Sequence, residues 1–234
     1  MAVKETSVFT RGSIAEIADA FPQAVDVFED AGIDYSCKGA RSLADAAAAV
    51  GYRADELIAR IQAAPRPDDA VAWSQQPLDE LARYLANDHS DTAGSKIPGI
   101  RAFLDGMADQ HPSLINIQRI ATLLATFSTV VTVHMAHEER DLFASLAVNG
   151  HGTAGLPNAR LSQRVLRELV EHEMFREQLR TMRELCLLID DDCATEIYAE
   201  LDKLSRSVHY HMHLENNILY PRAIDFENQL RRAS

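Results

Sequence analysis

The stretch Val208–Pro221, VHYHMHLENNILYP, decides the fold. It holds His211 and Glu215 four residues apart. At about 100° per residue, this spacing puts both side chains on one face of a helix, one turn apart. The earlier stretch HMAHEERDLF repeats the pattern with His134 and Glu138, and both copies read H-M-x-x-E-x-x-x-L-aromatic. A His/Glu pair repeated on two helices predicts a pseudo-symmetric site with two halves, which the rest of the chain holds in place.

The composition predicts an all-α protein. Hydrophobic residues make up 47% of the 234 residues, and the chain has only 10 glycines and 8 prolines. Ala, Leu, Glu and Arg dominate, and these residues favour helices. The length suits one large domain, or a medium domain with a small companion.

The charge and the cysteines exclude several classes of protein. The net charge is −12, and no Lys/Arg cluster provides the basic face of a nucleic-acid binder. No stretch approaches the ~20 apolar residues of a membrane helix, and the N-terminal sequence lacks the apolar core of a secretory signal. The three cysteines, Cys37, Cys186 and Cys193, show no disulfide-framework spacing. We therefore predict a cytoplasmic protein with reduced thiols and with no nucleic-acid or membrane partner.

Composition also divides the chain. A capping box at Ser13 and Glu16 opens a first short helix, Gly32 ends a second, and two more short helices are expected at 42–50 and 53–64. The prediction is a small helical N-terminal domain with Cys37 over 1–64, a Pro-rich linker over 65–76, a helical bundle over 77–223 and a polar tail over 224–234.

Four longer helices are expected in the bundle, at about 77–108, 113–148, 159–188 and 191–220. The first is expected to kink near Gly94, a Gly-rich loop occupies 149–158, and the last is expected to end before Pro221. Four long helices joined by short connections predict an up-down-up-down four-helix bundle.

Each long helix carries one histidine inside its apolar stripe, and two helices add a glutamate. The separations between these histidines are all roughly 40 residues, as expected for ligands at one depth in antiparallel helices. The predicted metal ligands are His89, His134, Glu138, His172, His211 and Glu215.

The chemistry of this set points to two metal ions. Buried carboxylates cost several kcal/mol without a positive partner, and four imidazoles with two carboxylates are too many donors for one tetrahedral zinc. They suit two octahedral ions with bridging carboxylates, and iron better than manganese. At least one position is then open to water, an oxo group or a diatomic molecule. The alternative is that the histidines are ordinary core residues and that each HxxxE motif is a surface pair. The repetition of the HxxxE motif on two helices favours a metal site.

The remaining histidines are expected to lie outside the site. His209 and His213 are each two residues from His211, about 200° around the helix, so they should face elsewhere. His111 at a helix start and His151 in the loop are expected to be solvated.

Two further residues have two interpretations each. His137 lies three residues from His134, so it can support the ligands from outside or face solvent. Glu171 precedes His172 and is either a carboxylate that supports the metal site or guides metal to it, or part of a solvated face.

The motifs HMAHEERDLF, EHE around His172 and HMHLENNILYP resemble the hemerythrin-like domain of the repair of iron centres family, which repairs iron–sulfur clusters. The segment GIDYSCKGARSL resembles the small N-terminal domain of the same family. The resemblance covers nearly the whole chain and implies two iron ions, with a bridging oxo or hydroxo group, bound by the six predicted ligands.

The resemblance also implies a function. It is the cytoplasmic repair of iron–sulfur proteins damaged by nitric oxide or oxidative stress, by iron donation rather than as a dedicated enzyme, in a homodimer that encounters NO or O₂. The alternatives are a di-iron NO reductase that forms N₂O, an O₂- or NO-binding carrier or sensor, and a metal-free helical scaffold.

The N-terminal domain departs from the family at one position. The family carries two adjacent cysteines, and here Ser36 stands in place of the first. Cys37 is therefore a candidate catalytic thiol acting without a neighbouring cysteine, or a small buried residue in a tight turn.

Overall fold

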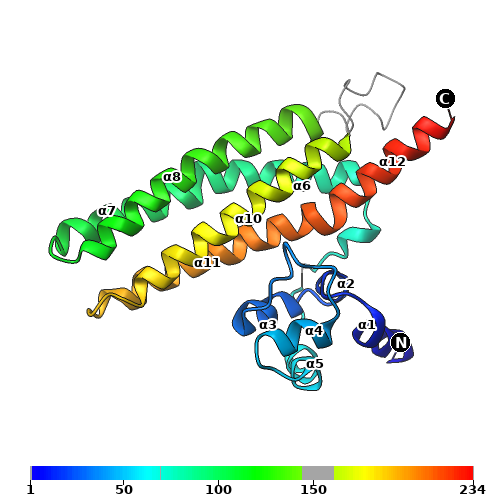
Figure 1. Cartoon of the computed structure of the whole chain (residues 1–234), viewed down its shortest axis with the longest axis horizontal. Helices are drawn as coiled ribbons and strands as arrows, with labels where there is room; N and C mark the ends of the chain where they lie inside the picture. The colour runs from blue at the N-terminus through cyan, green and yellow to red at the C-terminus, as the bar shows by residue number, and fades with distance from the viewer. Residues whose placement is uncertain (1, 69, 144–160, 234) are drawn as a thin grey trace. The chain divides into compact units, whose positions relative to one another are not determined.

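A computed structural model describes residues 2–68, 70–143 and 161–233, and helices account for almost all of its regular structure (Figure 1). The all-α prediction is confirmed. The chain divides into two compact units. The bundle unit is Leu78–Val208, and the small unit combines Met1–Pro77 with His209–Ser234.

The bundle unit holds the long helices. Helix α8 packs against α7 and α10, and α6 packs against α8. The bundle core is formed by apolar side chains at helical spacing, among them Leu81, Leu85, Leu104, Ile117, Ile120, Leu124, Phe127, Phe175, Leu179, Ile197 and Leu201, all nearly inaccessible to solvent. Its elements are α6 (Leu78–Asp91), the π-helical turn η2 (Thr92–Lys96), α7 (Ile97–Gln110), α8 (Ile115–Glu138), the π-helical turn η3 (Glu139–Phe143), α10 (Leu161–Cys186) and α11 (Cys193–Leu214). Helix α11 begins in this unit and ends in the small unit.

The kink expected near Gly94 takes a specific form. Residues 92–96 widen into the π-helical turn η2, so α6 continues into α7 without leaving the helical path. Pro98 comes directly after the π-helical turn, in which the Ile97 N–H donates to the Thr92 carbonyl, so the regular i→i−4 hydrogen bonds are already interrupted where the proline lacks its N–H.

The end of the second long helix and the loop that follows it, 149–158, fall largely within 144–160, outside the described residues. The preceding span Ile115–Phe143 is long and apolar enough to cross a membrane by length and composition alone, although the sequence pattern predicted no such span. A core helix of a bundle meets the same criteria, and the side chains of Ile117, Phe127 and Val131 are buried here.

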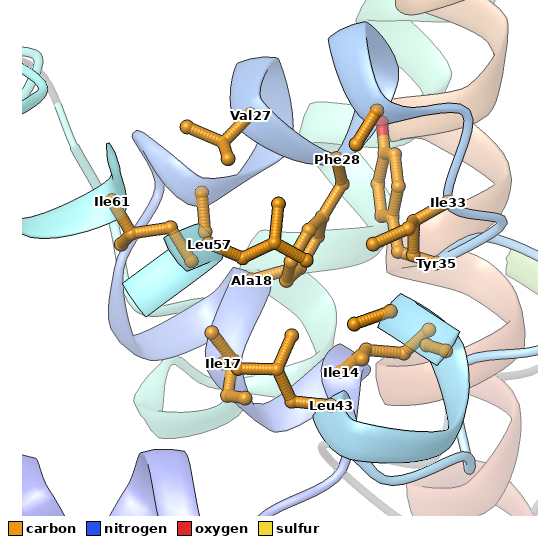
Figure 2. Close-up of a cluster of buried hydrophobic side chains, with 14 of the residues drawn as sticks. Ile14, Ile17, Ala18, Val27, Phe28, Ile33, Tyr35, Leu43, Leu57 and Ile61 are labelled. Atoms are coloured by element: carbon orange, nitrogen blue, oxygen red, sulfur yellow. The ribbon is translucent and has the colours of Figure 1, made fainter. Parts of the chain in front are cut away.

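The small unit contains short helices around a core of its own. Figure 2 shows Ile14, Ile17, Phe28, Leu43 and Leu57 pointing toward one another from α2, α3, α4 and α5. The elements are α1 (Ala2–Arg11), α2 (Ile14–Ala20), α3 (Ala24–Ala31), α4 (Leu43–Ala49), α5 (Ala54–Ala63), the 3-10 turn η1 (Trp73–Gln75), the end of α11, the π-helical turn η4 (Glu215–Leu219) and α12 (Tyr220–Ala233).

Local signals in this unit match the structure. The Ser13–Glu16 capping box is present in both directions. Gly32 ends α3 with a left-handed φ of 72°, which glycine adopts without steric cost. Helix α1, by contrast, was not expected.

The C-terminal end differs from the prediction. The last long helix does not end at Tyr220, and the stretch predicted as a polar tail forms most of α12. Pro221 is the second residue of α12 and comes directly after the π-helical turn η4, in which the Tyr220 N–H donates to the Glu215 carbonyl, so the regular i→i−4 hydrogen bonds are already interrupted there. The Arg222 side chain donates to the carbonyls of Trp73 and Gln76, 3.1 and 2.7 Å away, which holds the end of the predicted linker against α12.

Gly39 lies where no side chain fits. A Cβ atom there would lie 2.8 Å from the Ala15 Cβ and would overlap the Asn217 side-chain oxygen. We expect Gly39→Ala to lower the free energy of unfolding by about 1–3 kcal/mol through overpacking. Gly106→Ala, in α7 with no atom beyond its own stretch of helix within 4 Å of the new Cβ, should instead stabilise by up to about 1 kcal/mol. Denaturant unfolding of both variants checks this, and equal effects would contradict the close packing at Gly39.

Candidate metal centre

Four of the predicted ligands lie in the bundle unit, and all four are buried. His89 comes from α6, His134 and Glu138 from α8, and His172 from α10. Their exposed fractions are 2%, 4%, 1% and 1%. Three helices therefore each bring polar donors into an apolar core, where polar groups require specific partners.

The ligand atoms converge on Glu138. Its Oε2 lies 3.5 Å from the His89 Nε2 and 3.3 Å from the His134 Nε2. The His134 Nε2 is in turn 3.0 Å from the His172 Nε2. Ligands about 2.1 Å from one octahedral ion are about 3.0 Å apart, so these separations are close to those of a metal site.

The outer ring nitrogens of two histidines face carboxylates. The His134 Nδ1 donates to Glu171 Oε2 at 2.7 Å, and Glu168 Oε2 lies 3.0 Å from the same nitrogen. The His89 Nδ1 donates to Glu139 Oε1 at 3.1 Å. When the ring is neutral, a carboxylate that accepts from Nδ1 places the proton there, so the Nε2 lone pair of each ring points inward.

This arrangement fits a metal ion. With their protons outside, the inner nitrogens of His89 and His134 are acceptors that face another acceptor, the Glu138 carboxylate. Three buried acceptors that face one another repel, whereas a cation among them makes the same atoms a ligand set. A histidine that binds a metal through one ring nitrogen usually donates from the other nitrogen to a carboxylate, as seen here. A set of nitrogen and oxygen donors suits iron.

The second copy of the motif has the same local geometry in the small unit. His211 Nε2 lies 3.0 Å from Glu215 Oε1, one helical turn away. The exposed fractions of the two residues are 6% and 0%. Each copy of the motif thus places its histidine and glutamate on one helix face, as the spacing predicted.

A π-helical turn contains or closely follows each of three predicted ligands. Turn η2 begins three residues after His89, η3 begins directly after Glu138, and η4 begins at Glu215 itself. A π turn adds one residue to a helical turn, which changes the face that the following residues occupy, and such turns are frequent at functional sites. The two copies of the motif therefore share backbone geometry as well as side chains.

His209 and His213 face away from His211, as the helical spacing predicted. The His209 Nδ1 lies 2.9 Å from Glu29 Oε1. The ring of His213 packs against Tyr35, with 5.4 Å between ring centres, and its burial lowers the pKa to about 4, so it is neutral at pH 7.

Two further histidines in the described part of the chain lie outside the set of predicted ligands. His137 is exposed on α8, and His111 is partly exposed beyond the end of α7. His151 lies outside the described residues.

Sequence reasoning missed two supporting carboxylates. Glu139 and Glu168 contact His89 and His134, yet each lies on a face that looks solvated in the sequence. The available signal is position, since Glu139 directly follows Glu138 and Glu168 is one turn before His172. Glu171 was expected either to support the metal site or to belong to a solvated face, and the structure supports the first. Its side chain is 42% exposed, yet its Oε2 lies 2.7 Å from the His134 Nδ1 and holds that ring.

A small cavity borders the site in the bundle unit. Its volume is about 160 Å³. Polar side chains dominate its lining, which comprises His137, Glu138, Asp141, Leu142, Leu161, Arg164, Val165, Arg167, Glu168 and Glu171. A small molecule or ion in this cavity would reach Glu138.

The Cys37 segment is tied to the turn that begins at Glu215. The side-chain amides of Asn216 and Asn217 donate to the Ser36 carbonyl at 3.2 and 3.0 Å, and the Cys37 backbone N–H donates to Asp34 Oδ1 at 2.9 Å. Cys37 is partly buried. The two asparagines of the HLENN segment thus serve as structural contacts of the small unit.

Comparison with known proteins agrees with this geometry. Residues 91–223 match the family described as hemerythrin HHE cation binding domain, and residues 10–65 match ScdA_N, a domain of unknown function. The chain is 26% identical over 219 residues to proteins named iron-sulfur cluster repair protein YtfE from Pectobacterium carotovorum, Pectobacterium atrosepticum and Yersinia pseudotuberculosis. Each alignment covers 91% of this chain and 96% of the relative.

The hemerythrin match covers more than half of the chain and includes five of the six predicted ligands, all except His89. The ScdA_N match covers most of the predicted N-terminal domain, and the relatives span nearly the full length. The chain belongs to the hemerythrin HHE cation-binding family and, within it, to the repair of iron centres proteins.

Proposed function

We propose that this protein repairs iron–sulfur clusters damaged by nitric oxide or oxidative stress, and that it does so by donating iron. The observation that carries the proposal is the arrangement at His134, with its Nδ1 held by Glu171 and its Nε2 directed at Glu138. The relatives named iron-sulfur cluster repair proteins support the reaction.

The proposed centre holds two iron ions. Glu138 and Glu215 would bridge them, with an oxo or hydroxo group as a further bridge. His89, His134, His172 and His211 would complete the two coordination spheres. The support for this assignment is the matching geometry of the two His/Glu pairs and the burial of all six residues.

When bound, ferrous iron would supply the metal that a damaged cluster has lost. The chain's own part is to hold that iron without thiolates. Imidazole and carboxylate donors bind ferrous iron less strongly than the sulfur ligands of a cluster do. Transfer of iron to the client therefore lowers the free energy. Glu168 and Glu171 border the cavity beside Glu138 and offer carboxylates along the way out.

Cys37 is proposed as a reactive thiol that contacts the client. Its segment is positioned by Asn216 and Asn217, which keeps it next to the turn that carries Glu215. A cytoplasmic location, a homodimer and encounters with NO or O₂ belong to the same proposal.

A second candidate function is the reduction of NO to N₂O. The cavity of about 160 Å³ beside Glu138 favours it, because the cavity admits diatomic molecules. Release of N₂O in a single turnover of the iron-loaded protein, at one N₂O per two iron ions, would support this function over iron donation.

The outer carboxylates should control iron affinity. We expect Glu168→Gln with Glu171→Gln to weaken iron binding about 10–100-fold, because neutral amide oxygens hold the His134 Nδ1 proton less strongly than the charged carboxylates do. Glu171→Gln alone should cost less, since Glu168 remains 3.0 Å from the same nitrogen. Iron titration against a chelator measures this.

The control is Glu177→Gln on the same helix, an exposed residue paired with Arg180. It should bind iron as the original protein does. Unchanged affinity in the double variant would show that the outer carboxylates do not set the ligand geometry.

Repair itself should depend on the proposed bridging residues. Glu138→Ala and Glu215→Ala should each lose bound iron and fail to restore an NO-damaged iron–sulfur enzyme. Cys37→Ser should keep its iron but restore the enzyme more slowly. Glu173→Gln, beside His172 but paired outward with Arg176, serves as the control. Repair at the original rate by the Glu138 or Glu215 variant would refute iron donation from this centre.

A further inference from the structure

A second group of metal-binding side chains lies in the bundle unit, away from the proposed iron ligands. It consists of His111, Asp191 and Cys193. His111 follows the end of α7, and the other two lie where α11 begins. Figure 1 shows that the connection from α7 to α8 and the connection from α10 to α11 lie at the same end of these helices.

The three ligand atoms lie close together. One atom from each residue falls within 4.8 Å of the others. The His111 Nδ1 is 3.8 Å from the Asp191 Oδ2. That distance is too long for a hydrogen bond, but it is close to the separation of about 3.4 Å between two ligands on one tetrahedral zinc ion.

Asp191 is oriented by the helix. Its Oδ1 accepts from the Cys193 backbone N–H at 3.0 Å, which caps the first turn of α11. This cap fixes the carboxylate, so its Oδ2 is the oxygen directed at His111. A capping role alone accounts for Oδ1, but it does not account for the imidazole beside Oδ2.

Cys193 supplies a thiol in the protonated state. Its side chain is nearly buried, with 8% exposed. Burial and the neighbouring Asp191 raise its pKa to about 11, so the sulfur carries a proton at neutral pH. A metal ion that binds here takes the place of that proton, as thiolate ligation requires.

We propose that His111, Asp191 and Cys193 bind a thiophilic divalent cation of the zinc class, with water as the fourth ligand. One imidazole, one carboxylate and one thiolate are all ligands that zinc takes in proteins. The ion would tie the end of α7 to the start of α11. The site is separate from the iron centre, whose proposed ligands include no sulfur.

Cobalt provides a direct test, because thiolate coordination gives Co²⁺ a near-ultraviolet charge-transfer absorption that nitrogen and oxygen ligands do not give. Full-length, iron-loaded protein is titrated anaerobically with Co²⁺ and then with Zn²⁺. We expect the band to grow to one Co²⁺ per chain and to disappear as Zn²⁺ displaces the cobalt. Iron content, measured in parallel, should stay constant.

Variants identify the sulfur. Cys193→Ser should abolish the band, and His111→Ala should weaken Co²⁺ binding at least about tenfold. Cys186→Ala should keep the band, since that thiol contacts the Met182 carbonyl and is not part of the cluster. His111 is partly exposed, so its variant keeps the test valid if the cysteine variant fails to fold.

Three results would overturn the inference. They are the absence of a band in the original protein, a band that persists in Cys193→Ser, and a band lost in Cys37→Ser instead. None of these results bears on iron donation, which is tested separately through Glu138 and Glu215.

Discussion

The direction of two imidazole rings is the constraint on which the bundle's chemistry depends. His89 and His134 place one nitrogen against an outer carboxylate and the other against Glu138 in the core. The outer contacts hold the protons, so the inner nitrogens are bases. A carboxylate buried among such bases costs several kcal/mol unless a positive charge lies between them.

The motif pairs a histidine with a glutamate twice by local rules. The i, i+4 spacing puts histidine and glutamate on one face, and the π-helical turn that begins at or directly after the glutamate changes the path of the helix. In the first copy the turn carries Glu139 toward His89. In the second it carries Asn216 and Asn217 to the segment before Cys37. One sequence pattern thus provides a side that carries the predicted ligands and a second side that differs between the copies.

Features that depend on periodicity could be predicted from the sequence. The helical class, the capping box at Ser13, the stop at Gly32 and the pairing of His134 with Glu138 all follow from local spacing. The continuation of the last helix through Pro221 could not be predicted, because the sequence does not show that the π-helical turn η4 directly precedes this proline.

Contacts made across the fold escaped prediction for a different reason. Glu139 and Glu168 look like solvated residues, since their role comes from histidines on other helices. Gly39 looks like an ordinary turn glycine until Asn217 is packed against it. Neither residue type nor spacing encodes such partners, which only tertiary packing brings together.

The central claim is that six buried nitrogen and oxygen donors hold two iron ions. Diffraction at the iron absorption edge, from crystals of anaerobically purified protein, tests it most directly. The account predicts two anomalous peaks per chain, with Glu138 and Glu215 each bonded to both. A single peak, or two peaks of which either lies beyond bonding distance of Glu138 or Glu215, would contradict it.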